Sequence, residues 1–346
     1  MLTLLATPGL ADTRPAVAGG KLKVFILAGQ SNMQGHGHVD AKPDSESVEP
    51  YLNGTLEFLT TDARTKHEFG KLKNNGTWVA RDDVLVLYND TQTESTGGPG
   101  GAWMGKLSPG FAGDNGKDEE KGSVEMGPEL GIGWALGDGL DSTVLLLKTA
   151  WGGKDLYEDF RPPSSGGKVG PFYTRMILEV KTALAHLHTL FPTAPADYEL
   201  AGFFWHQGWN DACGAAPDEY KDDLPNLIKD VRTDLGVPKL PFTVGVSGMG
   251  GYRPYSDTQC TGALDVLTDT IIPAQFSVAN ATLHPEFAGT VTAVETRDFH
   301  REAKYSPGSQ CYHWNNNCES YWRVGQAMGA GMLKLLGSEA VEVQAA

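Results

Sequence analysis

Residues 23–37 have the sequence KVFILAGQSNMQGHG, in which an apolar run passes directly into small and polar residues. Residues 24–28 are apolar on both faces, as in a strand that helices cover on both sides. Gly29 permits a tight turn, and Ser31 then lies at the carboxyl end of the strand, where parallel α/β sheets bind their ligands. The stretch therefore predicts a central parallel strand that ends in a candidate nucleophile. A serine that caps the next helix is the simpler alternative.

Similar apolar runs recur along the chain with helical patterns between them. We expect strands at residues 23–28, 84–88, 143–148, 200–205 and 241–246. We expect helices at residues 129–140, 173–190, 218–235 and 319–336, each after one of the last four strands. This alternation is typical of βαβ units in an α/β fold. Residues 39–81 and 97–121 show no clear period, so we expect long surface loops there.

Composition limits both the class of protein and its partners. The 346 residues are 40% hydrophobic and 21% charged, which is ordinary for a packed globular protein. We expect one domain over residues 21–337, a candidate leader, truncated relative to a full signal peptide, at residues 1–20, and a tail at residues 338–346. A formal charge of −15 repels nucleic acid and anionic membrane surfaces, so we expect neither as a partner. No apolar run has the ~18 to 20 residues that a membrane span needs.

Cysteines and glycosylation motifs favour secretion. The even set of four cysteines fits no zinc template, and we favour pairing Cys311 with Cys318 and Cys213 with Cys260. Motifs of the form N-x-[ST], which are N-glycosylation acceptors, begin at Asn53, Asn75, Asn89 and Asn280. Four unpaired thiols in a cytosolic protein are the alternative.

Two further strands deliver polar groups to the same edge of the predicted sheet. Residues 145–156 read LLLKTAWGGKDL, and Gly153 can present its backbone N–H to a developing oxyanion. A plain turn is the alternative for this glycine pair. Residues 203–211 read FFWHQGWND, where the Asn210 amide can donate a neutral hydrogen bond to the same oxyanion. So dense a polar cluster is hard to explain by packing alone.

The fourth segment, residues 309–333, reads SQCYHWNNNCESYWRVGQAMGAGML and places His313 just before the last helix. Histidine titrates near pH ~6.5, so it can accept the serine proton and later return it to a leaving group. His206 is the obvious rival among the nine histidines.

Together and in this order, the four segments resemble the SGNH hydrolase superfamily and, more closely, its sialate O-acetylesterase domain family, which overlaps carbohydrate esterase family 6. GQSNM, AWGGKDL, GWND and YHWNNNCESY carry the likeness, with MGPEL and EDFRPPS in addition. The resemblance implies an α/β fold, a three-layer α/β/α sandwich around a mainly parallel five-stranded sheet. It also implies Ser31 as nucleophile, His313 as general base, and the oxyanion donors Ser31 N–H, Gly153 N–H and Asn210.

One position departs from the family pattern. Many relatives have an aspartate three residues before the histidine, whereas this chain has Gln310. The acid that orients His313 is therefore open among Asp298, Glu295, Glu319, Asp211 and a backbone carbonyl, and we favour Asp298.

The resemblance implies a serine esterase that removes O-acetyl groups from a carbohydrate, sialic acid or an acetylated polysaccharide, without metal or cofactor. We expect substrate contacts from side chains beside the four segments: Gln30, Trp151, Lys154, Gln207 and Trp209. Two alternatives remain: a carbohydrate-binding protein that has lost turnover, which Gln310 favours, and a lipid or acyl-ester hydrolase of the same superfamily. The sequence leaves the oligomeric state open.

Overall fold

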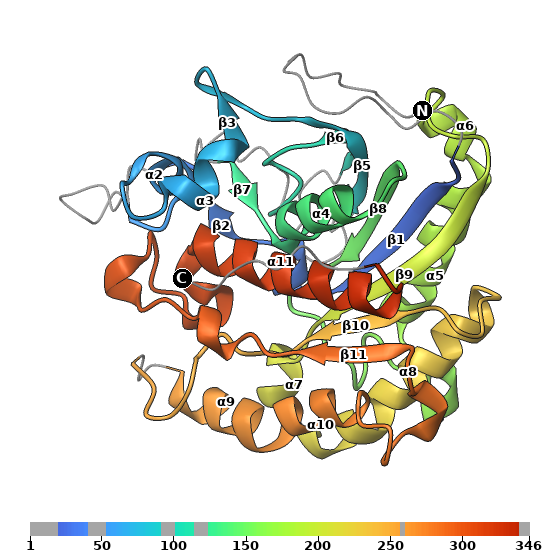
Figure 1. Cartoon of the computed structure of the whole chain (residues 1–346). Helices are drawn as coiled ribbons and strands as arrows, with labels where there is room; N and C mark the ends of the chain where they lie inside the picture. Colours follow the sequence, from blue (N-terminus) through green and yellow to red (C-terminus); the bar gives the residue numbers. More distant parts are fainter. Residues whose placement is uncertain (1–19, 41–52, 91–100, 114–123, 257–259, 339–346) are drawn as a thin grey trace.

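The computed structural model describes residues 20–40, 53–90, 101–113, 124–256 and 260–338. Within these ranges seven strands form one sheet in the order β11-β10-β9-β1-β8-β5-β6 (Figure 1). Every neighbouring pair is parallel except β5 with β6, which is antiparallel. The strands are β1 (Leu22–Gly29), β5 (Arg81–Asp90), β6 (Gly101–Leu107), β8 (Val144–Ala150), β9 (Tyr198–His206), β10 (Phe242–Gly245) and β11 (Val291–Val294).

All five strands expected from the sequence are present and, together with β11, form the parallel part of this sheet. The two that were not predicted, β6 and β11, lie at its two edges. The interpretation of residues 97–121 as loop is therefore wrong for β6. That strand contains two glycines, Gly101 and Gly105, and an edge strand needs no continuous apolar run because only one of its sides is paired.

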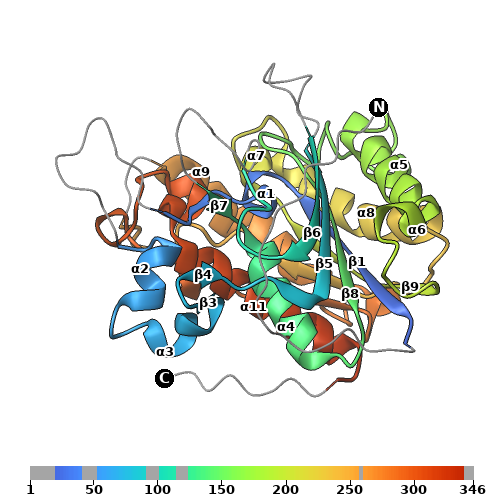
Figure 2. The ribbon, with the colours of Figure 1, turned by 90° about the horizontal axis from the view of Figure 1, so that it is seen from above.

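Helices cover both faces of the sheet and confirm the three-layer sandwich (Figures 1 and 2). On one face α4 (Pro128–Gly139) packs along α11 (Cys318–Leu335). On the other lie α5 (Pro171–Ala185) and α8 (Tyr220–Asp234). The helix expected over residues 173–190 is broken at His186, after which α6 (Leu187–Leu190) adds one turn.

Short elements fill the connections. They are the helices α1 (Ser31–Gln34), α2 (Leu56–Thr61), α3 (Lys66–Phe69), α7 (Trp209–Ala212), α9 (Thr261–Val266) and α10 (Ile272–Ser277), and the strand pairs β2 (Gly37–His38) with β7 (Glu125–Met126) and β3 (Lys73–Asn74) with β4 (Thr77–Trp78). The expectation of an unstructured loop at residues 39–81 is thus wrong for its described part, since elements of two to six residues are too short to show a period. Residues 41–52 lie outside the described ranges.

A buried ion pair between β8 and α4 supports the end of α1. Lys148 of β8 and Glu129 of α4 are both fully buried, with Lys148 Nζ 2.8 Å from Glu129 Oε2. The same ammonium donates to the backbone oxygens of Gln34 and Phe111, each at 2.6 Å. Because a buried charge is tolerated only when it is paired and hydrogen-bonded, this lysine holds the end of α1 against the sheet.

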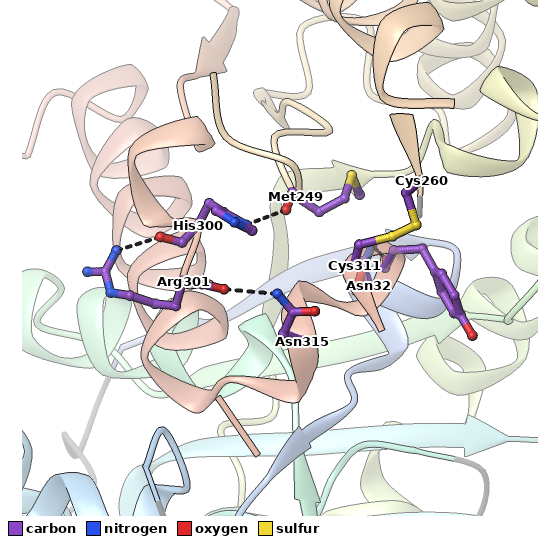
Figure 3. Close-up of a disulfide and its surroundings, with 8 residues drawn as sticks. Asn32, Met249, Cys260, His300, Arg301, Cys311 and Asn315 are labelled. Carbon is purple, nitrogen blue, oxygen red and sulfur yellow. Dashed lines mark hydrogen bonds between the residues drawn. A yellow bond between two sulfur atoms is a disulfide. The ribbon is translucent and has the colours of Figure 1, made fainter. Parts of the chain in front are cut away.

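The disulfide joins Cys260 to Cys311, so both favoured pairings are wrong (Figure 3). Cys213 is an exposed free thiol and Cys318 a buried one. Cys318 opens α11 and donates its S–H to His38 O at 2.9 Å, which turns it away from Cys311. In the described ranges we find no helix whose length and apolar content would let it cross a bilayer.

Candidate active site

Three neighbouring strands bring the predicted residues to one edge of the sheet. Gly29 at the end of β1 pairs in register with Ala150 of β8 on one side and with His206 of β9 on the other. Ser31, Gly153 and Asn210 follow these strand ends within two to four residues. The parallel sheet therefore places the three segments next to one another at its carboxyl edge.

Ser31 lies in a turn that the neighbouring strands hold by backbone hydrogen bonds. We name Gly29–Gln34 the nucleophile turn. Gly29 has φ +151°, and a Cβ there would lie 2.1 Å from His206 O, so only glycine fits. Trp151 N–H donates to Gly29 O at 3.2 Å, and Gln30 N–H donates to His206 O at 3.4 Å. Ser31 then begins α1 and is 6% exposed.

Three donors at this edge are left available. Among the described residues, no hydrogen-bond acceptor contacts the backbone N–H of Ser31 or of Gly153. Gly153 is exposed in a left-handed conformation, φ +71°. The amide of Asn210, which is half-buried, uses its Oδ1 to accept from Gln30 Nε2 at 2.8 Å. Its Nδ2 has no hydrogen-bond partner in the described part of the chain.

His313 reaches this edge on a loop before α11. We name residues 308–317 the histidine loop. Asn32, the neighbour of Ser31, donates its Nδ2–H to Tyr312 O at 2.8 Å. The hydroxyl of Tyr321 donates to Asn32 Oδ1 at 2.9 Å and lies 3.3 Å from His313 O. The residues next to Ser31 and next to His313 are thus fastened together, although no hydrogen bond between Ser31 and His313 themselves is present in the described residues.

Gln310 occupies the place of an orienting acid. Its Oε1 lies 3.0 Å from His313 Nδ1, and an amide oxygen can only accept, so Nδ1 carries the proton. This tautomer leaves Nε2 unprotonated and able to act as a base. Burial lowers the pKa of the half-buried His313, and the neighbouring His36 lowers it further. The imidazole is therefore neutral at neutral pH.

His36 packs flat on His313, with ring centroids 4.1 Å apart and planes inclined by 16°. His36 Nδ1 lies 3.6 Å from one carboxylate oxygen of Glu125, and His38 Nε2 lies 3.9 Å from the other. His36, which directly precedes β2, therefore borders the imidazole from the β2–β7 side.

The preference for Asp298 as orienting acid is not supported by these contacts. Asp298 is exposed, and its carbonyl oxygen accepts from Arg301. The other carboxylates considered bond elsewhere: Glu295 pairs with Arg297, Glu319 pairs with Arg301 and Arg323, and Asp211 accepts from Leu156 N, Tyr157 N and Gln207. None of these carboxylates forms a hydrogen bond or ion pair with His313 among the described residues.

The structure divides the side chains expected to bind substrate into two groups. Gln30, Gln207 and Trp151 are buried and in this conformation have no surface to offer a ligand. Trp151 packs instead against Phe172, with ring centroids 5.3 Å apart. Trp209 and Lys154 are each partly exposed. The ring centroids of Trp209 and Tyr312 are 5.7 Å apart, and Lys154 Nζ lies 3.6 Å from Asp159 Oδ1.

His206, the rival to His313, is buried at the end of β9. Its Nδ1 donates to Gly245 O at 2.9 Å, and burial lowers its pKa to about 4. It supports the nucleophile turn through its backbone and has no exposed ring nitrogen. Its neutral imidazole is thus a packing group.

Sequence reasoning missed the parts played by Gln310 and His36. Gln310 was treated as a missing acid, although its spacing of three residues from His313 was a signal that it faces the same ring nitrogen. His36 lies five residues after Ser31, and nothing in its neighbourhood along the chain indicates a contact with a residue 277 positions later.

Comparisons with known proteins agree with this architecture. The family model described as carbohydrate esterase, sialic acid-specific acetylesterase matches residues 21–284. A solved protein from Arabidopsis thaliana is 17% identical, with a TM-score of 0.53, over 91% of this chain and 99% of its own. The solved structure of NanS is 12% identical, with a TM-score of 0.52, over 94% and 99% of the two chains. No curated protein gives a match.

At these identities the two solved structures show the fold alone. The family match shows more than the fold, because it spans most of the chain and includes the segments of Ser31, Gly153 and Asn210. His313 lies beyond the end of the matched region. The chain belongs to the sialic acid-specific acetylesterase family of carbohydrate esterases.

Proposed function

We propose that this protein is a serine esterase that hydrolyses O-acetyl esters on a carbohydrate through an acetyl-Ser31 intermediate. The observation that carries the proposal is the meeting of three strand ends, with Ser31, Gly153 and Asn210, beside a histidine loop fastened to Asn32. Hydroxyl, imidazole and free N–H donors at one edge are the groups that acyl transfer requires.

In the proposed first step His313 Nε2 takes the Ser31 proton while Oγ attacks the acetyl carbonyl carbon. The carbonyl oxygen becomes an oxyanion, which the N–H groups of Ser31 and Gly153 and the Asn210 amide stabilise. Collapse expels the sugar hydroxyl, which receives the proton from His313. Water then repeats the sequence on the acetyl-enzyme and releases acetate.

The orienting group in this proposal is the neutral Gln310 rather than a carboxylate. Its Oε1 fixes the tautomer of His313, as an aspartate does in the serine-histidine-aspartate triad, but adds no negative charge to stabilise the imidazolium. We therefore expect a working but weaker base than in a triad.

The test is acetate release by the wild type and by Ser31→Ala, first from p-nitrophenyl acetate and then from O-acetylated sialic acid and O-acetylated xylan. The proposal expects turnover that depends on Ser31. Equal background rates would favour a carbohydrate-binding protein without turnover, the candidate that the amide at Gln310 keeps open. Ser31-dependent activity on octanoyl but not acetyl esters would favour a lipid hydrolase.

Secretion is part of the same proposal. Two of the four glycosylation motifs, at Asn75 and Asn280, present exposed side chains, and the Cys260–Cys311 disulfide suits an oxidising compartment. Expression in a glycosylating host should give a mass shift that endoglycosidase removes. Replacing both asparagines with glutamine should abolish the part of the shift that these two sites supply.

A further inference from the structure

Gln30 was expected to contact substrate, but its side chain is 1% exposed and its amide is hydrogen-bonded to Asn210, Gln207 and Gly208. We propose that Gln30 is a positioning residue that orients the Asn210 amide so that its N–H₂ group faces the oxyanion. This inference rests on the function proposed above, and it assigns that function a residue outside the reacting groups.

Backbone donors fix which way the Gln30 amide faces. Its oxygen, Oε1, accepts from the backbone N–H of Gly208 at 3.1 Å and from that of Asn210 at 3.2 Å. A backbone N–H can only donate, so the atom that meets these two groups must be the oxygen. The nitrogen of the Gln30 amide is therefore on the other side, next to Asn210.

This orientation passes on to Asn210. Gln30 Nε2 lies 2.8 Å from the Asn210 amide, and a donor there requires the oxygen of that amide as its acceptor. With Oδ1 held by Gln30, the Nδ2–H₂ group of Asn210 is turned the other way, and in the described residues it has no acceptor. A neutral donor aimed before substrate arrives stabilises a charge that develops only in the transition state.

A second glutamine supports the first from behind. Gln207 is 2% exposed, and its Nε2 donates to Gln30 Oε1 at 3.2 Å, to Lys154 O at 3.1 Å and to Asp211. Asp211 in turn accepts from the backbone N–H of Leu156 at 3.0 Å. The same buried network thus reaches the loop that follows Gly153. Several hydrogen bonds on the buried amides of Gln30 and Gln207 restrain their rotation, which suits a device that fixes the direction of one amide.

Gln30→Glu separates orientation from packing. The variant keeps an oxygen for the donors on Gly208, Asn210 and Gln207, and its volume is nearly unchanged. Once its carboxyl group is ionised, at a pH above the pKa that burial raises, the variant has no donor for Asn210 Oδ1. The Asn210 amide must then rotate and give its N–H₂ to the new carboxylate. Its oxygen then faces the oxyanion. We expect kcat on an acetyl ester to fall roughly 100-fold, as when one oxyanion donor is removed, with KM changed less than about threefold.

A double-mutant cycle with Asn210→Ala tests whether the effect passes through Asn210. If Gln30 acts by orienting Asn210, Gln30→Glu should change kcat by less than about threefold in the Asn210→Ala background. Losses that multiply to roughly 10⁴-fold would overturn the proposal, because Gln30 would then act independently of that amide. Gln326→Glu is the control, since Gln326 Nε2 donates to Gly131 O at 2.7 Å and, in the described residues, has no bond to Gln30, Gln207 or Asn210.

A readout without turnover distinguishes this proposal from the proposed function. In ¹⁵N-labelled protein the Asn210 side-chain amide signal, assigned by its loss in Asn210→Ala, should move in Gln30→Glu and stay in place in Gln326→Glu. An unmoved signal would overturn the orientation, whatever the activity. If the signal moves while wild type and Ser31→Ala hydrolyse acetyl esters equally, the esterase proposal fails and the positioning of Asn210 stands.

Discussion

The nucleophile turn and the histidine loop meet at one edge of the sheet but are held in place by different means. The nucleophile turn lies between two parallel neighbours, and its backbone bonds run to Trp151 and His206 at the ends of adjacent strands. No residue of the histidine loop pairs with a strand in the described part of the chain. Trp314, Asn315 and Asn316 all have positive φ, between +53° and +59°, a region that non-glycine residues adopt at a cost.

Side chains and one covalent bond hold the histidine loop instead. Asn315 Nδ2 donates to Arg301 O at 3.0 Å, Asn316 Nδ2 donates to His36 O at 2.9 Å, and Cys311 is bonded to Cys260 (Figure 3). The comparison teaches that Ser31, the proposed nucleophile, is positioned by the sheet, whereas His313, the proposed base, depends on single side chains. Point substitutions should therefore disturb the base far more easily than the nucleophile.

The largest effect expected is loss of the reacting pair itself. Ser31→Ala and His313→Ala should each lower kcat roughly 10⁴-fold or more, and the double variant should be no worse than either. Steady-state hydrolysis of p-nitrophenyl acetate measures all three. Multiplied losses in the double variant would mean that the two regions do not act as one unit.

The disulfide gives the next effect. Cys311→Ser removes a crosslink that spans 51 residues, which in the chain-entropy model lowers the free energy of unfolding by about 4 kcal/mol. Thermal unfolding with and without reductant measures it, and kcat should fall as well because Cys311 lies two residues before His313. Cys213→Ser, which replaces an exposed free thiol, is the control and should change neither quantity.

The same contrast explains what could be predicted from the sequence. The meeting of Ser31, Gly153 and Asn210 at one edge could be predicted because each follows an apolar strand, and the carboxyl ends of neighbouring parallel strands lie side by side. The five central strands were found for the same reason. The edge strand β6 and the short helices α2 and α3 were missed, because glycine content and short length hide any period.

The histidine loop was only partly predictable. His313 was identified through a family resemblance, but its contact with Gln310 was not predicted. Only carboxylates and a backbone carbonyl were considered as its partner, with Asp298 favoured. The disulfide pairing was wrong for a related physical reason: three successive left-handed residues reverse the chain between Cys311 and Cys318, and sequence spacing carries no record of them.

Substitutions of Gln310 test how far His313 depends on a single side chain, and one of them should change the pH dependence of kcat/KM. Gln310→Ala should lower kcat roughly 10- to 100-fold by freeing the tautomer of His313, a smaller loss than that of the base itself. Gln310→Glu should instead place a carboxylate beside Nδ1 and raise the pKa of His313. Because the neutral imidazole is the active form, the acid limb of kcat/KM should then move to higher pH. If the acid limb of the pH–rate profile is the same in Gln310→Glu and the wild type, residue 310 does not act on His313.

The smallest effect expected concerns the end of the histidine loop. Asn317 caps α11, where its Oδ1 accepts from Glu319 N at 2.9 Å, and its Nδ2 donates to Tyr305 O at 3.2 Å. Asn317→Ala should lower the free energy of unfolding by about 1 kcal/mol, as for other lost caps, and should also lower kcat because the loop is fastened there. Thr55→Ala removes the corresponding cap of α2, whose Oγ1 accepts from Phe58 N at 3.2 Å. Thr55→Ala should lose a similar amount of stability in thermal unfolding but keep its kcat. That result would show that loss of the Asn317 side chain lowers kcat through the histidine loop and not through lower stability. If both variants keep full kcat, the claim that single side chains hold the histidine loop in place does not apply to Asn317.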